Sequence, residues 1–467
     1  MPLEHPTLTT SNKTFSTLRC GQQIAKSGRI KVSKKAWSVR FVALLGASFF
    51  VAYNILLGLE VKDPFVIYST LLPLHSVAYL VVGWLFYRNP ATGKVGNDLV
   101  SVIIPVYNQK TVIEDVIDAV YNSTYKNIEV IAVNDGSKDG TREVLDSIAK
   151  KHRGLKVIHK HNEGKRKAVA TGFYESKANF VVLIDSDSII DKHAITELMK
   201  AFYADPTIGA TVAYAKVANV NKNIITKCQD AWYDYSFNIR KAAESSFGNV
   251  LCCSGCMAAY RREAIAHYIP YWIRSRLPNS DDRELTTSVI LPPFTKKLLE
   301  AMAAYDDAED RGLTGQALVE WKAVYVPTAV VYTEVPYTMK IFLRQQKRWK
   351  KGTTRVNFFM SAFFWRKHPV MSLIFYIDFM MTFTTPFIVA IIFVYNPFIL
   401  QNAWLSTSFI AGMVFLSIVH GLDYKFRDPI STNWKYKPLM NLITAFILSW
   451  LIFPAIWSYR KNEWGTR

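Results

Sequence analysis

The sequence predicts an α/β domain with a doubly wound, mostly parallel sheet, fused to an α-helical multi-pass membrane domain. Two observations lead to this fold class. Through the middle of the 467-residue chain, short apolar runs alternate with segments of helical spacing, which is typical of parallel strands joined by crossover helices. Near both ends lie long apolar stretches, of which the first two contain no charged residue, and such stretches indicate membrane helices.

The long apolar stretches have the length that a membrane crossing requires, about 20 residues. The first begins at residue 41, and no small-residue cleavage site follows it, so we do not interpret it as a signal peptide. The stretches cover residues 41–59, 65–87, 370–394, 398–422 and 438–457.

The charge pattern predicts how these helices are oriented. Lys and Arg number 56 against 37 Asp and Glu, which gives a net charge of +19. Basic residues gather before the first apolar stretch and again between the fourth and fifth, and basic loops stay in the cytoplasm. This rule explains much of the surplus, so we expect no nucleic-acid partner. We expect four crossings, a cytoplasmic middle domain and a location in the plasma membrane of the cell.

The last apolar stretch is ambiguous because basic residues flank it on both sides. Lys437 precedes it, and Arg460 and Lys461 follow it. A fifth crossing would export the two following charges, so we favour an interfacial or re-entrant helix. The expected organisation is a basic cytoplasmic arm (1–40), two transmembrane helices (41–88), a cytoplasmic α/β domain (89–335), an amphipathic interfacial segment (336–368), two transmembrane helices (369–422) and a cytoplasmic C-terminal segment (423–467).

Polar side chains follow the predicted strands of the middle domain at the point where each strand ends. Asn108 follows the run that begins at residue 99, and Asp135 ends the run that begins at 128. Asp185 and Asp187 follow the run "FVVLI". Ligands of doubly wound sheets bind at the carboxyl ends of the strands. We therefore expect these side chains to share one site.

The pair in "VVLIDSDS" suggests a nucleotide diphosphate and a metal ion. Two carboxylates one residue apart repel each other, and a bound Mg²⁺ or Mn²⁺ that also takes phosphate oxygens removes the repulsion. A solvated strand end is the usual explanation of Asp-x-Asp alone, but the register with Asp135 favours a site. The sequence contains no GxGxxG or GxxxxGK[ST] motif, which argues against dinucleotide and P-loop chemistry.

Three of the five cysteines lie in "CCSGC", residues 252–256. A zinc site would need a second pair of ligands, and none is near in the sequence. A redox pair would need a thioredoxin-like setting. We expect reduced thiols in a tight loop.

Several motifs in order resemble those of inverting, membrane-bound, processive glycosyltransferases with the GT-A fold. "PVYN", "VNDGSKDGT" and "GKRKAVATGF" resemble the nucleotide-binding part, and "VVLIDSDS" resembles the metal motif. "RKAAESSFGNVLCCSGCMAAYRR" resembles the acceptor region and "NSDDRELT" the general-base motif. "QQKRWKKGT" resembles the Gln-x-x-Arg-Trp motif and "EWGTR" the gating loop. Within that group, the sequence is most similar to hyaluronan synthases and their chitin-oligosaccharide-synthase relatives.

The resemblance implies roles for individual residues. The side chains expected at the nucleotide are Tyr107, Asn108, Asp135, Lys165, Arg166, Asp185, Trp464 and Arg467, of which the last two would close over the donor. Asp187 would hold the metal, and Asp282 would be the general base. Gln345, Arg348 and Trp349 would lie at the diphosphate and the acceptor, and Cys252, Ser254, Gly255 and Trp349 would line the acceptor site.

Each of these roles has a simpler alternative. The basic amphipathic segment that carries Arg348 and Trp349 is typical of a membrane-surface helix, which is compatible with the motif. Asp282 could pair with Arg283, and Trp464 could be an interfacial anchor. An additional acid, Asp378, lies inside an apolar stretch. Such acids are usually functional, but Asp378 could also lie close enough to the membrane face to stay hydrated, so we do not count it among the site residues.

The resemblance implies a UDP-sugar-dependent hexosyltransferase that needs Mn²⁺ or Mg²⁺ and builds a β-linked polysaccharide. Hyaluronan from UDP-GlcNAc and UDP-GlcA is the first expectation, with translocation of the nascent polysaccharide through the lipid bilayer. A β-1,4-GlcNAc product made from UDP-GlcNAc alone is the alternative. A polyprenyl-phosphate glycosyltransferase fits the motifs "QQKRW" and "WGTR" poorly. An inactive membrane scaffold would not need the intact Asp187, Asp282 and Arg348.

Overall fold

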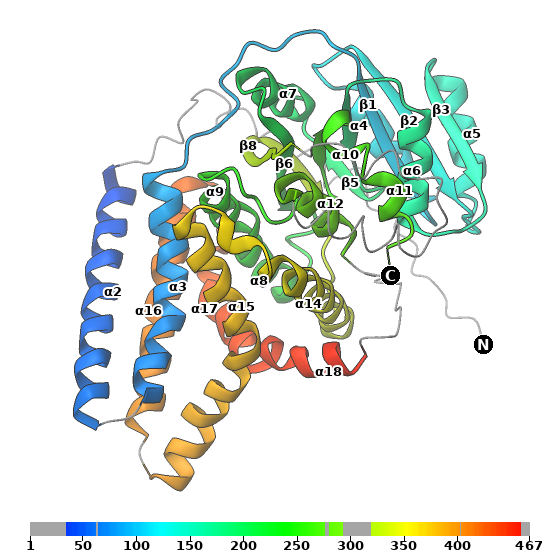
Figure 1. The fold of residues 1–467 in the computed structure, drawn as a ribbon. Coiled ribbons are helices and arrows are strands. Elements are labelled where there is room, and N and C mark those ends of the chain that lie inside the picture. Colours follow the sequence, from blue (N-terminus) through cyan, green and yellow to red (C-terminus); the bar gives the residue numbers. More distant parts are fainter. Residues whose placement is uncertain (1–33, 62–63, 276–279, 293–318, 402, 459–467) are drawn as a thin grey trace, which may run out of the picture.

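The computed structural model describes residues 34–61, 64–275, 280–292, 319–401 and 403–458 (Figure 1). Within these residues eight strands form one sheet in the order β3-β2-β1-β4-β7-β6-β8-β5. The strands are β1 (Val100–Val106), β2 (Ile128–Asp135), β3 (Leu155–Lys160), β4 (Phe180–Leu183), β5 (Ser188–Ile190), β6 (Ile208–Val217), β7 (Ala258–Arg261) and β8 (Lys322–Thr333).

One half of the sheet is parallel, as the sequence predicted. β1 pairs in parallel with β2 and with β4, and β2 pairs in parallel with β3. Every residue of β1 is buried, as expected for a strand covered on both faces. The chain returns between these strands through α4 (Ile113–Tyr121), α5 (Thr141–Lys151) and α6 (Lys165–Glu175). The doubly wound α/β class is confirmed here.

The other half of the sheet is mixed. β7 is antiparallel to both β4 and β6, and β5 is antiparallel to β8, whereas β6 and β8 are parallel. Helix α7 (Ala194–Ala204) packs on β6 and β8. Because Ala258 of β7 pairs with Leu183 of β4, the "CCSGC" segment just before β7 comes to lie beside Asp185 and Asp187.

Further helices occur in the sequence between β6 and the third apolar stretch. They are α8 (Ile224–Asp234), η2 (Tyr235–Ile239), α9 (Arg240–Ser245), α10 (Arg262–Ile265), α11 (Ile269–Trp272), α12 (Asp281–Ile290), α14 (Met339–Ser361) and η3 (Phe364–Arg366). Helix α14 contains the "QQKRW" segment and begins at Thr338, whose hydroxyl accepts a hydrogen bond from the Ile341 amide at 3.4 Å. It packs against α12 and α15.

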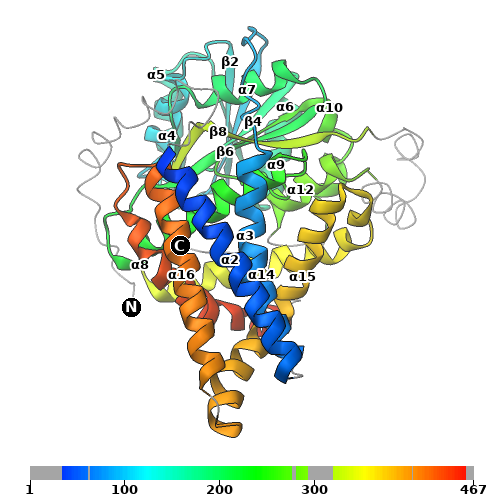
Figure 2. The same cartoon turned by 90° about the vertical axis from the view of Figure 1, so that its left-hand side faces the viewer.

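The apolar stretches form long helices that extend from one side of the α/β domain (Figure 2). They are α2 (Lys34–Val61), α3 (Pro64–Leu85), α15 (Pro369–Ala390) with η4 (Ile391–Ile399), and α16 (Trp404–Arg427). Helix α2 packs on α3 and α16. Among the described residues, three segments are long and apolar enough to cross a membrane: Pro369–Ile399, Ser406–Arg427 and Asn433–Trp457.

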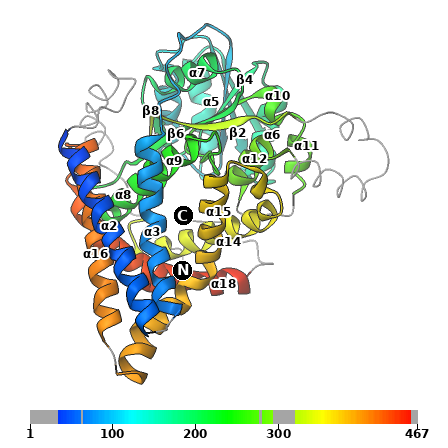
Figure 3. The ribbon, with the colours of Figure 1, turned by 60° about the vertical axis from the view of Figure 1, so that its left-hand side comes forward.

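The last apolar segment bends along its length. It consists of η5 (Asn433–Tyr436), α17 (Lys437–Ile443), η6 (Thr444–Leu448), η7 (Ser449–Leu451) and α18 (Ile452–Trp457). Helix α18 lies across the direction of α15 and α16 and beside α14 (Figures 1 and 3). The interfacial or re-entrant helix stays a prediction, as do the expected domain boundaries and the number of crossings.

Candidate active site

Asp135, at the end of β2, organises the start of α6. Its carboxylate accepts hydrogen bonds from the amides of Glu163 (3.0 Å) and Gly164 (2.8 Å) and from Lys160 Nζ (3.3 Å). Gly164 has φ +96°, a left-handed conformation that glycine adopts without steric cost. The turn fixes where α6 begins, and the first two residues of α6 are the predicted ligands Lys165 and Arg166.

Asn108 joins the turn after β1 to the turn after β2. Its amide donates to Ser137 Oγ at 2.9 Å, and its side-chain Oδ1 accepts from the Lys138 amide at 2.9 Å. Asn108 has φ +51°, which asparagine tolerates better than most residues. Its neighbour Tyr107 is 45% exposed, so the ring is accessible at the sheet edge where the sequence predicted a ligand.

Lys165, Asp185 and Asp282 meet at this edge, although they come from α6, the end of β4 and α12. Lys165 Nζ lies 2.6 Å from Asp185 Oδ1 and 3.8 Å from Asp282 Oδ1. Burial alone would lower the pKa of Lys165, but the charges of Asp185 and Asp282 raise it above its ordinary value. The lysine is therefore a permanent cation between the two acids.

Gly255 completes this cluster through its backbone. Its amide donates to Asp282 Oδ2 at 2.8 Å, and its carbonyl accepts from the Asp185 amide at 3.0 Å. A Cβ atom at this position would lie 2.7 Å from Lys165 Nζ and 3.0 Å from both carboxylate oxygens of Asp185. Only glycine leaves room for the three charged groups. We call Lys165, Asp185, Gly255 and Asp282 the charged cluster.

Asp282 has the electrostatic setting of a proton acceptor. Burial raises the pKa of its carboxyl, and the nearby Asp185 and Asp281 raise it further, whereas Lys165 and the Gly255 amide oppose the shift. The net direction is upward. A carboxylate with a raised pKa is a stronger base. The alternative pairing with Arg283 is not what is observed, because Arg283 donates to Asn357 Oδ1 on α14 at 2.9 and 2.6 Å.

Asp187 and Arg348 come from distant parts of the sequence, just after β4 and on α14. Burial raises the pKa of Tyr233, and the charge of Asp187 adds to this increase while that of Arg348 opposes it. The charges of both side chains therefore act on Tyr233. Asp187 Oδ1 also accepts a hydrogen bond from Ser188 Oγ at 3.2 Å.

Helix α14 brings its Gln-x-x-Arg-Trp motif against α8. The rings of Trp349 and Trp232 are stacked with centroids 5.9 Å apart and an interplanar angle of 17°, and Phe237 meets Trp349 edge-on. Within the described part of the chain, two buried atoms of the motif, Gln345 Oε1 and Arg348 Nε, have no hydrogen-bond partner. Such atoms are costly unless a ligand or water satisfies them.

The "CCSGC" loop lies against the charged cluster and is held from α9. Lys241 Nζ is 3.0 Å from Ser254 Oγ, and the Cys253 amide donates to Thr286 Oγ1 at 2.8 Å. The described cysteines are free, as the reduced-thiol prediction expects. Burial raises the pKa of Cys252 to about 11 and those of Cys253 and Cys256 to about 12. These thiols are protonated at neutral pH.

Comparison with known proteins gives this arrangement a family. Residues 101–269 match the family model described as Glycosyl transferase family 2. A hyaluronan synthase of Streptococcus pyogenes is 29% identical over 406 residues, which cover 84% of this chain and 89% of that protein. Residues 101–269 therefore form a glycosyltransferase domain similar to family 2, and most of the chain is similar to hyaluronan synthases. An N-acetylglucosaminyltransferase of Bradyrhizobium diazoefficiens is 30% identical over 264 residues, or 56% of this chain and 50% of that protein.

The architecture of this glycosyltransferase agrees with a solved relative. The mannosyltransferase PcManGT from Pyrobaculum calidifontis, determined with GDP-Man and Mn²⁺, superposes with a TM-score of 0.50 at 18% identity. The match covers 84% of this chain and 97% of PcManGT. It supports the predicted GT-A fold. With its long apolar helices and its similarity to hyaluronan synthases, the chain is a membrane protein.

The structure gives Arg166 an environment that the sequence did not predict. Its guanidinium pairs with the Asp281 carboxylate, donates to Glu284 Oε2 at 2.9 Å and donates to the Trp272 carbonyl at 3.1 Å. Glu284 is fully buried and also accepts from Tyr268. Arg166 therefore joins α6 to α12 and orients the helix that carries Asp282, which differs from the direct contact with the nucleotide that we expected.

Two predicted residues, Trp464 and Arg467, lie outside the described residues. Of the others, Lys165, Asp185, Gly255 and Asp282 meet in the charged cluster. Asn108 and Asp135 lie at the ends of β1 and β2, and Gln345, Arg348 and Trp349 lie on α14. The sequence analysis did not identify two groups near the charged cluster: Lys241 on α9 and the acidic partners of Arg166. The only signal for the acids was their spacing around Asp282, since Asp281 and Glu284 fall on one face of a helix.

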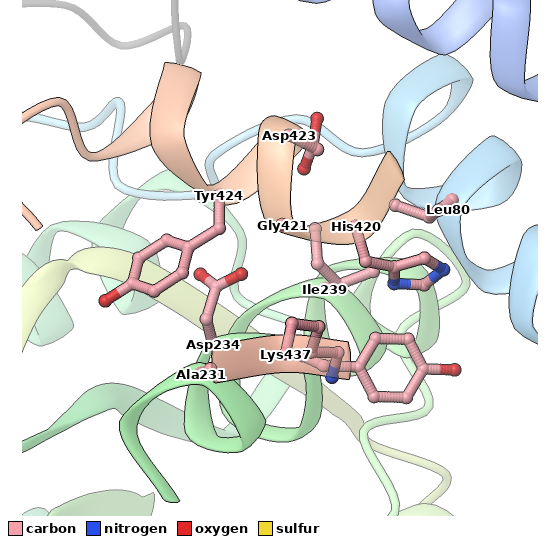
Figure 4. Close-up of a pocket in the computed structure, with 10 residues that line it drawn as sticks. Leu80, Ala231, Asp234, Ile239, His420, Gly421, Asp423, Tyr424 and Lys437 are labelled. Carbon is pink, nitrogen blue, oxygen red and sulfur yellow. The ribbon is translucent and has the colours of Figure 1, made fainter. Parts of the chain in front are cut away.

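A separate polar junction joins α8 to the membrane helix α16. A small pocket there is lined by Leu80, Ala231, Asp234, Tyr235, Ile239, His420, Gly421, Asp423, Tyr424 and Lys437, and Figure 4 shows Asp234 pointing from α8 toward Tyr424 and Gly421. Arg427 donates to both oxygens of Asp234, at 2.8 and 2.5 Å, and to Asp423 at 2.6 Å. The junction anchors α8, and with it Trp232.

Proposed function

We propose that this glycosyltransferase is a processive, inverting enzyme that polymerises a β-linked polysaccharide from UDP-sugars and passes it across the membrane. Hyaluronan, made from UDP-GlcNAc and UDP-GlcA, is the product we favour. The observation that carries the proposal is the charged cluster, in which an acid with a raised pKa stands beside a lysine and a glycine loop at the carboxyl edge of the sheet.

Asp282 acts as the general base. An acceptor hydroxyl attacks the sugar only as its proton is removed, and a positioned carboxylate contributes roughly 10²–10⁴-fold to such a step. The Gly255 amide holds one oxygen of Asp282 at 2.8 Å, so the other oxygen faces Lys165 and the site. Direct displacement of UDP inverts the anomeric carbon, so an α-linked donor gives a β-linked product.

The nucleotide lies along the ends of β1, β2 and β4. Tyr107 and Asn108 border the base, and Asp135 shapes the turn before α6. Lys165 and Asp185 lie nearest the diphosphate and ribose. Arg348 binds the departing phosphate oxygens, which its fork of N–H donors suits better than a lysine would. Trp464 and Arg467 close over the donor.

A divalent cation fits the oxygen ligands at Asp187. The described residues contain no group of three or more His, Cys, Asp or Glu side chains arranged around one point. Mg²⁺ and Mn²⁺ need only one or two protein carboxylates when a diphosphate and water complete the shell. Asp187 would hold the ion, with Asp185 next to it. When bound, the ion would neutralise the negative charge that develops on UDP.

The acceptor binds between the "CCSGC" loop and the paired indoles. Cys252, Ser254 and Gly255 form one wall, and the stacked Trp349 and Trp232 form the other. Flat aromatic faces pack well against the C–H faces of sugar rings. The buried Gln345 Oε1 can accept a hydrogen bond from a sugar hydroxyl. The wall of Trp349 lies on α14, which also packs against membrane helix α15.

Coverage favours hyaluronan over a GlcNAc polymer. The two kinds of relative are almost equally identical to this chain, at 29% and 30%. The similarity to the hyaluronan synthase extends over 84% of the chain, against 56% for the N-acetylglucosaminyltransferase. A chitin or chitin-oligosaccharide synthase that uses UDP-GlcNAc alone is the second candidate.

The test is UDP release by the purified, detergent-solubilised protein with Mn²⁺ or Mg²⁺. The donors are UDP-GlcNAc alone, UDP-GlcA alone and both together, and the product is sized and digested with hyaluronidase or chitinase. We expect a high-mass, hyaluronidase-sensitive product only when both donors are present. A chitinase-sensitive product from UDP-GlcNAc alone would move the protein to the second candidate.

Two variants control this experiment. Asp282→Asn removes the proposed base and should abolish polymer. Asp146→Asn is the matched control, because Asp146 is an exposed acid on α5 that pairs with His159 at 3.0 Å. It should match the unsubstituted protein. Folded unsubstituted protein that releases no UDP with any donor or metal would contradict the proposed function.

A further inference from the structure

An acid inside an apolar helix has one partner on α9 and another on the apolar helix α3. Asp378 lies on α15, about 14 Å along the helix axis from its first residue at 1.5 Å per residue. Its carboxylate is 2.8 Å from a guanidinium nitrogen of Arg240 on α9 and 3.5 Å from His75 Nε2 on α3. Intramembrane acids are costly and are usually retained for a function.

Arg240 is held on that side by more than the ion pair. Its guanidinium donates to the Tyr79 hydroxyl at 3.1 Å and lies over the Tyr79 ring, 4.7 Å from the centroid. The Tyr79 side chain is fully buried. The first residue of α9 is therefore fixed against two apolar helices, α3 and α15.

The other polar residues of α9 hold the "CCSGC" loop. Lys241 Nζ reaches Ser254 Oγ at 3.0 Å, and Glu244 Oε2 accepts from the Leu251 amide at 3.1 Å. The Glu244 carbonyl also accepts from the Asn249 amide at 3.0 Å. The short helix α9 thus contacts the membrane helices through Arg240. It contacts the loop through Lys241 and the residues just before the loop through Glu244.

The loop transmits the position of α9 to the charged cluster. Gly255 follows Ser254 directly, and its amide and carbonyl bond to Asp282 and to Asp185. A shift of α9 along α15 would move Ser254 and Gly255 relative to the proposed base. Misplacement by about 1 Å can cost roughly 10²-fold in rate.

We propose that Asp378 is a positioning residue for glycosyl transfer, acting through Arg240 and α9 on the acceptor loop and on Asp282. The inference rests on the proposed function, because it requires that a membrane helix, α15, helps to align the acceptor with the base. Asp378 touches neither substrate. Its loss should leave the donor site intact. The rate of transfer to the acceptor should fall more than the rate of transfer to water.

The test compares Asp378→Asn with the unsubstituted protein in lipid nanodiscs. The readouts are the KM for each UDP-sugar, the mass distribution of the product, and the share of UDP release that gives free sugar instead of polymer. We expect unchanged KM values, polymer synthesis reduced about 10–100-fold, shorter chains and a larger hydrolysis share. Chain length and hydrolysis share do not depend on the fraction of folded enzyme, so a purely structural role would not change them.

Three further variants sharpen the result. Asp378→Glu keeps the charge and should restore chain length in part. Lys241→Met cuts the link on the loop side and should shorten the product as well, and combining it with Asp378→Asn should add little, because both act on one path. Glu320→Gln breaks another ion pair beside α15, with Lys367 at 2.5 Å, and should leave chain length unchanged.

The outcomes separate this inference from the proposed function. Unsubstituted protein that makes no polymer would contradict the function itself. Active unsubstituted protein, with Asp378→Asn giving the same chain length and hydrolysis share, would overturn the positioning role. If Asp378→Asn does not fold, Lys241→Met decides: normal chain length in that variant would overturn the proposal.

Discussion

The donor side and the acceptor side of the site are built in different ways. On the donor side, Asn108 and Asp135 already have protein hydrogen-bond partners in neighbouring turns. On the proposed acceptor side, Gln345 Oε1 is buried without a partner among the described residues, and the surrounding walls come from the "CCSGC" loop, α8 and α14. The turns after β1 and β2 thus form the proposed donor side through local hydrogen bonds. The proposed acceptor side depends on the packing of elements that are far apart in the sequence.

Removing the proposed base, Asp282, should have the largest effect. Asp282→Asn keeps the shape and the hydrogen bond from Gly255 but cannot accept a proton, so we expect polymer synthesis to fall by about 10²–10⁴-fold. UDP binding, measured by isothermal titration, should change little, because the donor edge is built by other residues. A large loss of UDP affinity would show that the two sides are not separable.

Adding one methyl group at Gly255 should be almost as damaging. In Gly255→Ala the new Cβ would lie 2.7 Å from Lys165 Nζ, so the lysine or the loop must move. We expect a loss of roughly 10²-fold in polymer synthesis, the cost of a misplacement near 1 Å. Gly154→Ala is the control, since a Cβ there meets nothing within 4 Å. Its strained φ of +101° should lower the melting temperature slightly without a specific loss of activity.

Exchanging the guanidinium proposed to bind the departing phosphate for an amine should have a moderate effect. Arg348→Lys keeps the charge but loses the fork that binds two phosphate oxygens. A hydrogen bond to a charged group contributes about 1.5–3 kcal/mol, so we expect kcat to fall roughly 10–100-fold at 1.36 kcal/mol per factor of ten. Initial rates at saturating donor measure it. An unchanged kcat would place Arg348 outside the reacting centre.

The smallest predicted effect is a shift of the pH profile. Because the pKa of Asp282 is raised, polymer synthesis should decline on the acid side at a higher pH than an ordinary aspartate would give. Lys165 opposes this rise, so Lys165→Met should move the acid limb to still higher pH, whatever it does to the maximum rate. The measurement is kcat/KM as a function of pH. An acid side of the profile that does not shift in Lys165→Met would show that Lys165 does not influence the pKa of the base.

The parallel half of the sheet could be predicted because β1, β2, β3 and β4 are local apolar runs with helices between them. The mixed half could not, since β6, β7 and β8 pair across long stretches of sequence, and only this pairing brings Gly255 to Asp185. Lys165 and Arg166 show the same limit. Adjacent residues of a helix point about 100° apart, so one faces Asp185 and the other faces α12, and the motif "GKRK" does not say which.

The buried ion pairs between α6 and α12 have an evolutionary consequence. Arg166 is matched by Asp281 and by the fully buried Glu284. Deleting one partner would strand a charge in the interior at a cost of about 3–5 kcal/mol, whereas replacing all of them together by apolar residues of similar volume can be neutral. Substitutions at these three positions are therefore tolerated only when they occur together. Among homologous chains they should covary as a set, even where the neighbouring Lys165 and Asp282 never change.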